Sequence, residues 1–425
     1  MISMKAAYLN PEIDDLLVSP QIMENPYPIY RKLRDEAPVL WSENWQSWVF
    51  SRYEDVNASL KDKVNLSNMG RQALLFSLFT PEQLGATTFL RTFFTQIDLI
   101  NSDPPDHTRM RKPVQRALMP RVIAAMEEKT RRLGKELWEA ALDRGTFDFV
   151  EHFAYPFPVI LVAEILGAPV ADRSRFKDWT AGFLAFQGTG RADFEQTIRS
   201  QDTLREFVGY VRELVGKRRV RPQPDLISAL IESDYTTEEL VATCCTLLVA
   251  GHETTTNLLG NIVRLLHLHP DQMKLLRQNR NLIPSAIDEV LRFDAPKQRN
   301  FRRSLHPHRF CGAEIDGNEM VFQLIGAANH DERVFPHPDR FDIHRSPNNH
   351  LTFGSGIHFC VGAVLARLEA RVFLELLLDC PRTVHLQKNS MEWQTRVQMR
   401  GPGALALKVG KSPRAIDTQP VRKSS

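Results

Sequence analysis

The feature that most constrains this fold is a long stretch without proline, "TTEELVATCCTLLVAGHETTTNLLGNIVRLLHLHP", which ends at Pro270. Thr236 and Glu239 have the spacing of a capping box, in which each side chain bonds the other residue's backbone N–H. Pro270 cannot continue the helix, because it has no N–H and its ring clashes with the preceding turn. The stretch therefore predicts one helix from the capping box to Pro270. A single helix of this length usually crosses a whole domain.

The other patterns predict further helices and a few strands. The segment "PSAIDEVLRF" reads as a shorter helix, with Pro284 in its first turn. After Cys360, apolar residues recur at helical spacing at Val364, Leu365, Leu368, Val372 and Phe373. The segment "SWVFSRY" is strand-like, and "HRFCGAEIDGNEMVFQLIG" predicts short strands around turns at Gly312 and Asp316-Gly317. The fold class is therefore mainly α with a minor β region.

The composition excludes several classes of protein. The net charge of the 425 residues is +3, and the basic residues form no dense block, so we expect no nucleic-acid partner. The N-terminus lacks a basic start and a long apolar core, and the most apolar helical run breaks at His252 and Glu253, so we expect neither a signal peptide nor a membrane anchor. The cysteines are odd in number and lack disulfide spacing, which favours a reducing, cytoplasmic location: Cys244, Cys245, Cys311, Cys360 and Cys380.

Cys360 is the cysteine with a chemical context. A lone cysteine is most often a small buried hydrophobic residue, which suits Cys244 and Cys245 in the long helix. Cys360 instead follows a glycine-rich loop, "FGSGIHFC", and precedes a helix, whose free N–H groups favour a thiolate. Gly354 and Gly356 allow the backbone to approach a flat partner closely. A thiolate in such a loop is a good ligand for a soft metal.

Zinc and haem iron are the two metals to compare. His358 and Cys360 are possible zinc ligands, with His350 nearby. Tetrahedral zinc needs four ligands at recognisable spacing, however, and no second pair is present. A single thiolate suits haem iron, because a macrocycle supplies the other ligands.

The segment "FGSGIHFC" resembles the haem-binding loop of the cytochrome P450 family, F-G-x-G-x-[HR]-x-C. The other family motifs follow in the family's order, from Asn25 to Gly401: "NPYPIYRKLRDEAPV", "WVFSRYEDV", "DPPDHTRMR", "AGHET", "EVLR" and "FPHPDRFDIHR". The resemblance implies a single P450 domain over residues 1–425, with haem between the long central helix and the helix after the cysteine loop. We expect residues 1–20 and 411–425 to be loosely ordered ends.

The resemblance assigns roles to individual residues. It implies haem b (iron protoporphyrin IX) with Cys360 as the axial ligand, and a thiolate there favours O–O cleavage. It places His107, Arg111, Arg302 and His358 at the haem propionates, because charge-assisted bonds to carboxylates are strong. Arg299 and Arg303 lie beside Arg302, and Pro113 interrupts the helix that carries Arg111. The remaining haem contacts that it implies are Ala250, Gly251, Phe353, Gly354 and Gly362.

Glu253 and Thr254 are the catalytic candidates, and the resemblance assigns them to proton delivery. They lie in the middle of an apolar helix, where a carboxylate is costly unless it is paired or functional. The alternative is a solvated polar stripe that continues through Thr255, Thr256 and Asn257. Gly251 lacks a side chain, so a ligand could lie against the helix there. We expect His252 to face away from the haem.

Two further sets of residues have structural or binding interpretations. Glu289 and Arg292 share a helix face, and the resemblance makes them a fold-locking pair instead of a surface ion pair. The Phe- and Leu-rich segments at 71–97 and 179–190 fall where the family caps its pocket, and core packing is the alternative for about half of them. We expect a large apolar substrate, with Lys297, Arg299 and Asn300 as a possible polar anchor.

The predicted function is a haem-thiolate monooxygenase that inserts one atom of dioxygen into an apolar organic molecule by hydroxylation or epoxidation, in secondary metabolism. A separate ferredoxin or flavodoxin, with its reductase, would supply electrons and dock on a basic face: Arg109, Lys112, Arg116 and Arg121. The alternatives are a peroxide-driven or rearranging haem-thiolate enzyme and a haem-based sensor or carrier. The Glu253–Thr254 pair argues against both, because neither needs proton delivery at that position.

Overall fold

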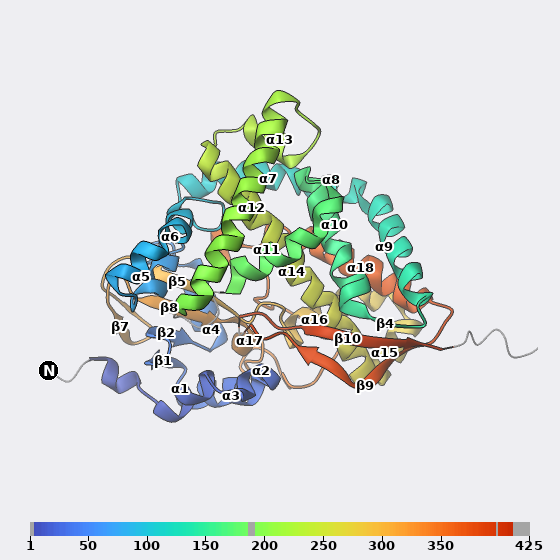
Figure 1. The fold of residues 1–425 in the computed structure, drawn as a ribbon. Helices are drawn as coiled ribbons and strands as arrows, with labels where there is room; N and C mark the ends of the chain where they lie inside the picture. The colour runs from blue at the N-terminus through green and yellow to red at the C-terminus, as the bar shows by residue number, and fades with distance from the viewer. Residues whose placement is uncertain (1–3, 186–191, 397, 411–425) are drawn as a thin grey trace, which may run out of the picture.

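A computed structural model describes residues 4–185, 192–396 and 398–410 of the chain (Figure 1). Its helices are α1 (Pro11–Leu17), α2 (Gln21–Glu24), α3 (Tyr27–Glu36), α4 (Tyr53–Lys61), α5 (Pro81–Ala86), α6 (Thr88–Thr95), α7 (Asp106–Ala117), α8 (Pro120–Ala125), α9 (Glu127–Leu142), α10 (Pro156–Leu166), α11 (Arg173–Ala185), α12 (Phe194–Val220), α13 (Leu226–Ile231), α14 (Thr237–Leu268), α15 (Pro270–Gln278), α16 (Ile283–Phe293), α17 (Ile325–Ala328) and α18 (Ala363–Asp379). The mainly helical class predicted from the sequence is confirmed.

The strands form three small sheets in the lower part of Figure 1, and α1–α3 lie below the largest of them. The largest has the order β1 (Val39–Ser42), β2 (Ser47–Phe50), β8 (Met320–Leu324), β5 (Arg299–Ser304) and β3 (Leu66–Ser67). Within it, β2 and β8 are parallel and the other pairs are antiparallel. The second sheet joins β4 (Thr146–Asp148), β10 (Pro402–Val409) and β9 (Val384–Trp393), and the third pairs β6 (His308–Phe310) with β7 (Ala313–Ile315).

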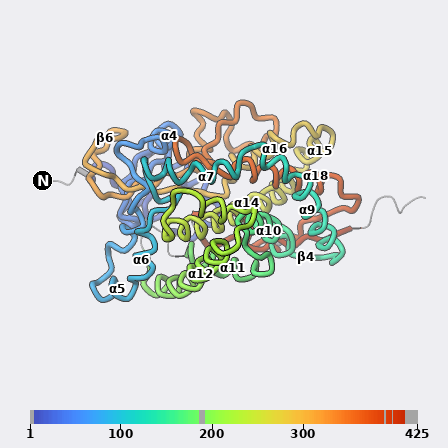
Figure 2. Tube along the Cα trace, turned by 90° about the horizontal axis from the view of Figure 1, so that it is seen from above, coloured from blue at the N-terminus to red at the C-terminus, as the bar shows by residue number. Residues whose placement is uncertain are grey.

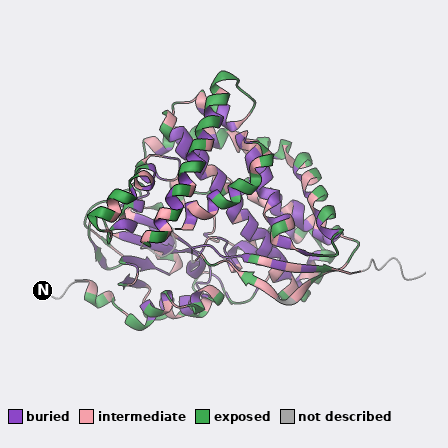
Figure 3. Cartoon of the chain, viewed as in Figure 1, coloured by how far each residue is buried: buried purple, intermediate pink, exposed green. Residues whose placement is uncertain are grey.

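The predicted long helix is α14, and it passes through the middle of the molecule. Thr236 and Glu239 form the expected capping box, and the helix ends two residues before Pro270. Seen from above, α14 runs between α10–α12 on one side and α16 and α18 on the other (Figure 2). Its residues are mostly buried, as are the inward faces of its neighbours (Figure 3). Thr255, Thr256 and Asn257 are all buried, so this part of α14 is not a solvated polar stripe.

Two expectations about local structure need correction. Residues 4–20 are not a loose end, because Ile13 and Leu17 of α1 are buried in the core. Val364 is exposed, since Leu365 takes the inward position at the start of α18. Sequence reasoning also missed the strand β5, "RNFRRS", which lacks an alternating apolar pattern because buried arginines occupy much of it. Residues 411–425 lie outside the described part of the chain.

Candidate active site

The loop before α18 presents Cys360 to a cavity inside the fold. The Cys360 backbone N–H donates to the Phe353 carbonyl at 2.8 Å, which closes the loop. Gly354 and Gly356 have φ of 74° and 71°, a backbone region that residues with a side chain rarely adopt. The exposed surface of Cys360 borders the cavity, which Phe353, Gly354, His358 and Gly362 also line.

The charge state of the Cys360 thiol depends on what it binds. Burial raises the pKa of the thiol above its ordinary value, and the Gly362 backbone N–H and the Arg111 guanidinium oppose this shift only in part. A coordinated metal cation deprotonates a thiol outright, so a bound metal ion would favour the thiolate that the sequence predicts.

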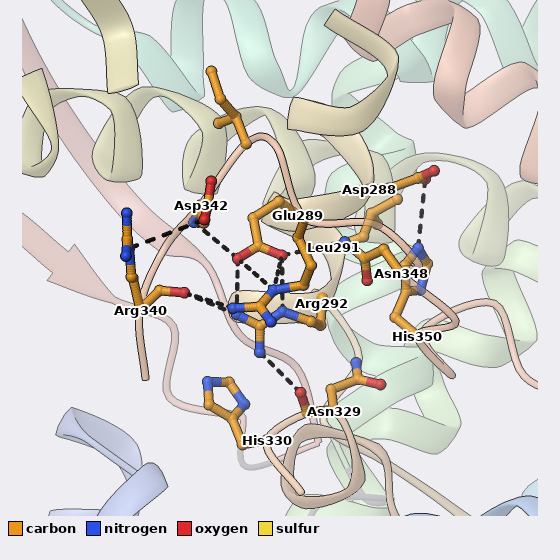
Figure 4. Close-up of polar contacts among 12 residues, drawn as sticks. Asp288, Glu289, Leu291, Arg292, Asn329, His330, Arg340, Asp342, Asn348 and His350 are labelled. Carbon is orange, nitrogen blue, oxygen red and sulfur yellow. Dashed lines mark hydrogen bonds and ion pairs between the residues drawn. The ribbon is translucent and has the colours of Figure 1, made fainter. Parts of the chain in front are cut away.

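A buried ion-pair network supports this loop from α16. Glu289 and Arg292 are both 0% exposed and pair through Arg292 Nε and Glu289 Oε2 at 2.8 Å. Arg345 and the Asn348 amide also bond the Glu289 carboxylate, and Arg292 donates to the Asn329 carbonyl (Figure 4). The pair therefore joins α16 to the segment that precedes the cysteine loop. It is not a surface ion pair.

Two imidazoles and three guanidinium groups gather near the cysteine loop. The rings of His107 on α7 and His358 lie 4.2 Å apart, and the Nε2 atoms of both are buried without a hydrogen-bond partner. Burial and neighbouring positive charges lower the pKa of His107 to about 4 and that of His358 to about 2. The guanidinium groups that line the cavity belong to Arg71, Arg111 and Arg302.

These arginines bond neutral acceptors. Arg111 donates to the Phe359 carbonyl, and the helix continues through Pro113. Arg302 donates to the Leu60 and Asp62 carbonyls at 2.8 and 2.9 Å. Of the three arginines weighed in β5, Arg302 alone lines the cavity, whereas the Arg299 guanidinium lies over the Trp45 ring at 4.1 Å. Sequence reasoning missed Arg71, because its segment carries no motif.

The opposite wall of the cavity comes from α14. Ala250, Gly251 and Thr254 line it, and the Thr254 hydroxyl donates to the Ala250 carbonyl at 3.2 Å. A Cβ at Gly251 would lie 2.5 Å from Val162 Cγ2, so the absence of a side chain at Gly251 permits the close packing of α10 against α14. His252 does not line the cavity, and its Nδ1 lies 2.7 Å from the Leu248 carbonyl.

Glu253 points to an ion pair instead of the cavity. Its Oε1 lies 2.7 Å from Arg396 Nη1, and the residue is 8% exposed. Arg396 lies in the connection between β9 and β10, so the sequence offered no sign of this pairing. The structure therefore places Thr254 and Cys360 in the lining of one cavity, whereas Glu253 is not part of that lining.

The aromatic segments contribute less to the cavity than the sequence predicts. Phe93, Phe94 and Phe183 pack in the core, and from residues 71–97 the cavity is lined by Arg71 alone. Part of the 179–190 segment lies outside the described residues. The apolar lining comes instead from the loop before α7 and from α10, α13 and α14: Leu99, Ile100, Val162, Ile165, Leu166, Leu226 and Leu247.

The arrangement fits a haem. Among the described residues, no group of three or more His, Cys, Asp or Glu side chains is placed to hold a metal ion, so a zinc site of protein ligands is not formed there. A cavity with one thiol donor suits a metal whose other ligands are a macrocycle. The two orphaned imidazole nitrogens suit an anionic cofactor, such as one with propionates, and so do the arginines, which form no ion pair with a carboxylate in the described part of the chain. These features define a haem-dependent oxidoreductase.

Comparisons with known proteins also indicate a haem protein. The Cytochrome P450 family model matches residues 68–392. A cytochrome P450 of Bacillus subtilis is 35% identical over 90% of this chain and 94% of its own. The 6-deoxyerythronolide B hydroxylase of Saccharopolyspora erythraea is 32% identical over 90% of this chain and 96% of its own. A myxobacterial cytochrome P450 solved with myristic acid is 36% identical, with a TM-score of 0.83 over 93% of this chain and 99% of that one.

The chain belongs to the cytochrome P450 family. It is a cytochrome P450 monooxygenase, an oxidoreductase with a haem-iron cofactor. Among the described residues, no helix is both long and apolar enough to cross a membrane.

Proposed function

We propose that this enzyme inserts one oxygen atom of dioxygen into a fairly large, mostly apolar organic molecule, by hydroxylation or epoxidation, in secondary metabolism. The observation that carries the proposal is one cavity with the Cys360 thiol on one wall and the Thr254 hydroxyl on another. The apolar side chains of α10, α13 and α14 complete its lining. The named hydroxylase among the relatives supports the type of reaction.

In this proposal the cofactor is haem b. Cys360 would ligate its iron, and His107, Arg111, Arg302 and His358 would hold its propionates. Ala250, Gly251, Phe353, Gly354 and Gly362 form the haem contacts that the resemblance implies, and all five line the cavity. When bound, the haem supplies the iron at which dioxygen is reduced.

The chain's own residues deliver protons and exclude water. The Thr254 hydroxyl orders water above the cofactor. The Glu253 carboxylate exchanges protons with solvent on the far side of α14, and Arg396 sets its orientation. The apolar wall keeps bulk water from the reacting atoms, which strengthens each hydrogen bond made there.

Electrons come from a separate ferredoxin or flavodoxin with its reductase. The support is a basic face on α7 and the start of α8, where Lys112, Arg116 and Arg121 are exposed. Arg109, expected in this face, instead pairs with Glu239 at 2.7 Å and with Asp106 at 3.0 Å, so it holds α7 against α14. The docking face is therefore smaller than the sequence predicts.

The test is the spectrum of the reduced protein with carbon monoxide. Wild-type protein is expected to show the strongly red-shifted Soret band of thiolate ligation. Cys360→His is expected to lose that band, while Cys311→Ala, which changes a cysteine outside the cavity, keeps it. A thiolate spectrum from Cys360→Ala would overturn the assignment.

A further inference from the structure

More cationic than acidic side chains line the cavity. Four cationic side chains line it: Arg71, Arg111, Lys297 and Arg302. A haem b has two propionates, which Arg111 and Arg302 are proposed to hold. The buried carboxyl that borders the cavity, Glu369, is no counter-charge, because burial raises its pKa well above the ordinary value and favours its neutral form.

Among these four cations, Lys297 has the fewest polar partners in the described part of the chain. Within the described residues, its ammonium group has no ion pair and no hydrogen-bond acceptor, whereas Arg71 donates to Asn68, Asn101 and the Phe301 carbonyl. Burial and the charge of Arg71 lower the pKa of Lys297 to about 8, so it is still mostly protonated at pH 7. An ammonium group that faces an apolar cavity without a counter-ion is costly, so an anion beside it would be favoured.

Two amides line the same cavity as this ammonium. Asn300 lies on β5 directly opposite Gln323 on β8, and both line the cavity. Gln323 is 0% exposed, and neither its amide nitrogen nor its amide oxygen has a hydrogen-bond partner among the residues that the structure describes. A buried amide with both atoms unsatisfied indicates that a ligand completes its hydrogen bonding.

The backbone fixes this corner of the cavity. Lys297 forms an antiparallel bridge with Met399, and β5 pairs with β8 over its length from Arg299 to Arg303. Asn300 and Gln323 therefore stand on a sheet and Lys297 on a bridge just before it, so a ligand bound there would be oriented relative to the apolar walls that the α14 residues provide.

We propose that Lys297, with the Asn300 and Gln323 amides, binds the carboxylate of a mostly apolar organic acid and so selects the substrate. One ammonium with neutral amides matches a single negative charge, which favours a carboxylate over a doubly charged phosphate. The apolar body of the acid then lies against Leu99, Ile100 and Leu247. This inference deepens the proposed monooxygenase function and rests on it.

The experiment compares linear carboxylic acids of 8, 12 and 16 carbons with their methyl esters, on haem-loaded full-length protein. Affinity is measured by calorimetry and by the ligand-induced Soret shift. We expect wild type to bind at least one acid about 10- to 100-fold more tightly than its ester, the range for hydrogen bonds to a charged group. Lys297→Met is expected to lose this preference and to bind the ester within about threefold of wild type.

The controls separate this inference from the proposed function. Lys274→Met, on exposed α15, is expected to keep the preference for the acid. Haem content and the carbon monoxide spectrum of Lys297→Met are expected to match wild type, and these report on the cofactor alone. The inference is overturned if wild type shows no preference for the acid at any chain length, or if Lys297→Met keeps it. Loss of haem from Lys297→Met would also overturn it, because the ammonium would then serve the cofactor.

Discussion

Glu253 and Thr254 are adjacent in the sequence but have different surroundings. A turn of α14 places Thr254 on the cavity wall and Glu253 against Arg396, because successive helical residues point about 100° apart. Proton delivery by both residues therefore requires the Glu253 carboxylate to exchange between Arg396 and water that reaches Thr254. This hypothesis makes Arg396 a positioning residue.

Thr254→Ala tests the proposed proton delivery at the residue that lines the cavity. We expect reductant consumption to continue while product falls, because without the hydroxyl the protons release hydrogen peroxide. A lost proton donor typically costs about 10²–10⁴-fold in rate. The measurement is the ratio of product to reductant consumed.

Thr256→Ala is the matched control for this ratio. The Thr256 hydroxyl also donates to a carbonyl four residues back, that of His252 at 2.9 Å, but Thr256 does not line the cavity. The proton-delivery hypothesis fails if Thr254→Ala keeps the wild-type ratio and rate, or if both variants lose product equally.

At the scale of elements, two buried carboxylates join segments that are far apart in the sequence. Glu289 ties α16 to the segment before the cysteine loop. Asp294 accepts from Tyr27 and Arg400, both at 2.6 Å, and from Arg264 on α14. Asp294 therefore joins α3, α14 and the segment just before β10. Either carboxylate without its partners would be a buried unpaired charge.

Glu289→Ala is expected to destabilise the fold by about 3–5 kcal/mol, because Arg292 stays buried and uncompensated. Arg292→Ala is expected to cost less, because Arg345 still pairs with the buried Glu289 carboxylate. Haem content after purification and the midpoint of chemical unfolding measure the effect. Asp288→Ala is the control, since Asp288 pairs with Arg367 at a half-exposed site on the same helix, where we expect a loss of no more than about 1 kcal/mol. Normal haem content in both Glu289→Ala and Arg292→Ala would contradict the role of the pair.

At the scale of the whole molecule, the exposed basic side chains of α7 and α8 lie on the cysteine-loop side of the fold. Arg111, on the same helix, donates to the Phe359 carbonyl beside Cys360, so this face lies close to the proposed haem ligand. A short path from a docked donor to the haem is what electron transfer requires. The exposed positive charges of Lys112, Arg116 and Arg121 would attract an acidic partner to this face.

Charge reversal at Lys112 or Arg116 is expected to slow reduction by an acidic ferredoxin about three- to tenfold at low salt. Raising the ionic strength to about 0.5 M is expected to remove most of the difference, because exposed charges are then screened. Lys274→Glu is the control, on α15, which lies away from α7 in both views (Figures 1 and 2). Equal rates for all the variants at low salt would show that docking does not use this face.

The sequence by itself determined the features that depend on local spacing. The capping box at Thr236, the loop that presents Cys360 and the Glu289–Arg292 spacing are short-range patterns, and the resemblance that they carry identified the family. Only the tertiary structure decided which partners meet across the chain. Arg396 reaches Glu253 over 143 residues, Arg400 reaches Asp294 over 106, and Gln323 joins Asn300 through a strand pairing. Such contacts leave no periodic signal, because burial and charge compensation act between elements whose order in the sequence says nothing about their distance in space.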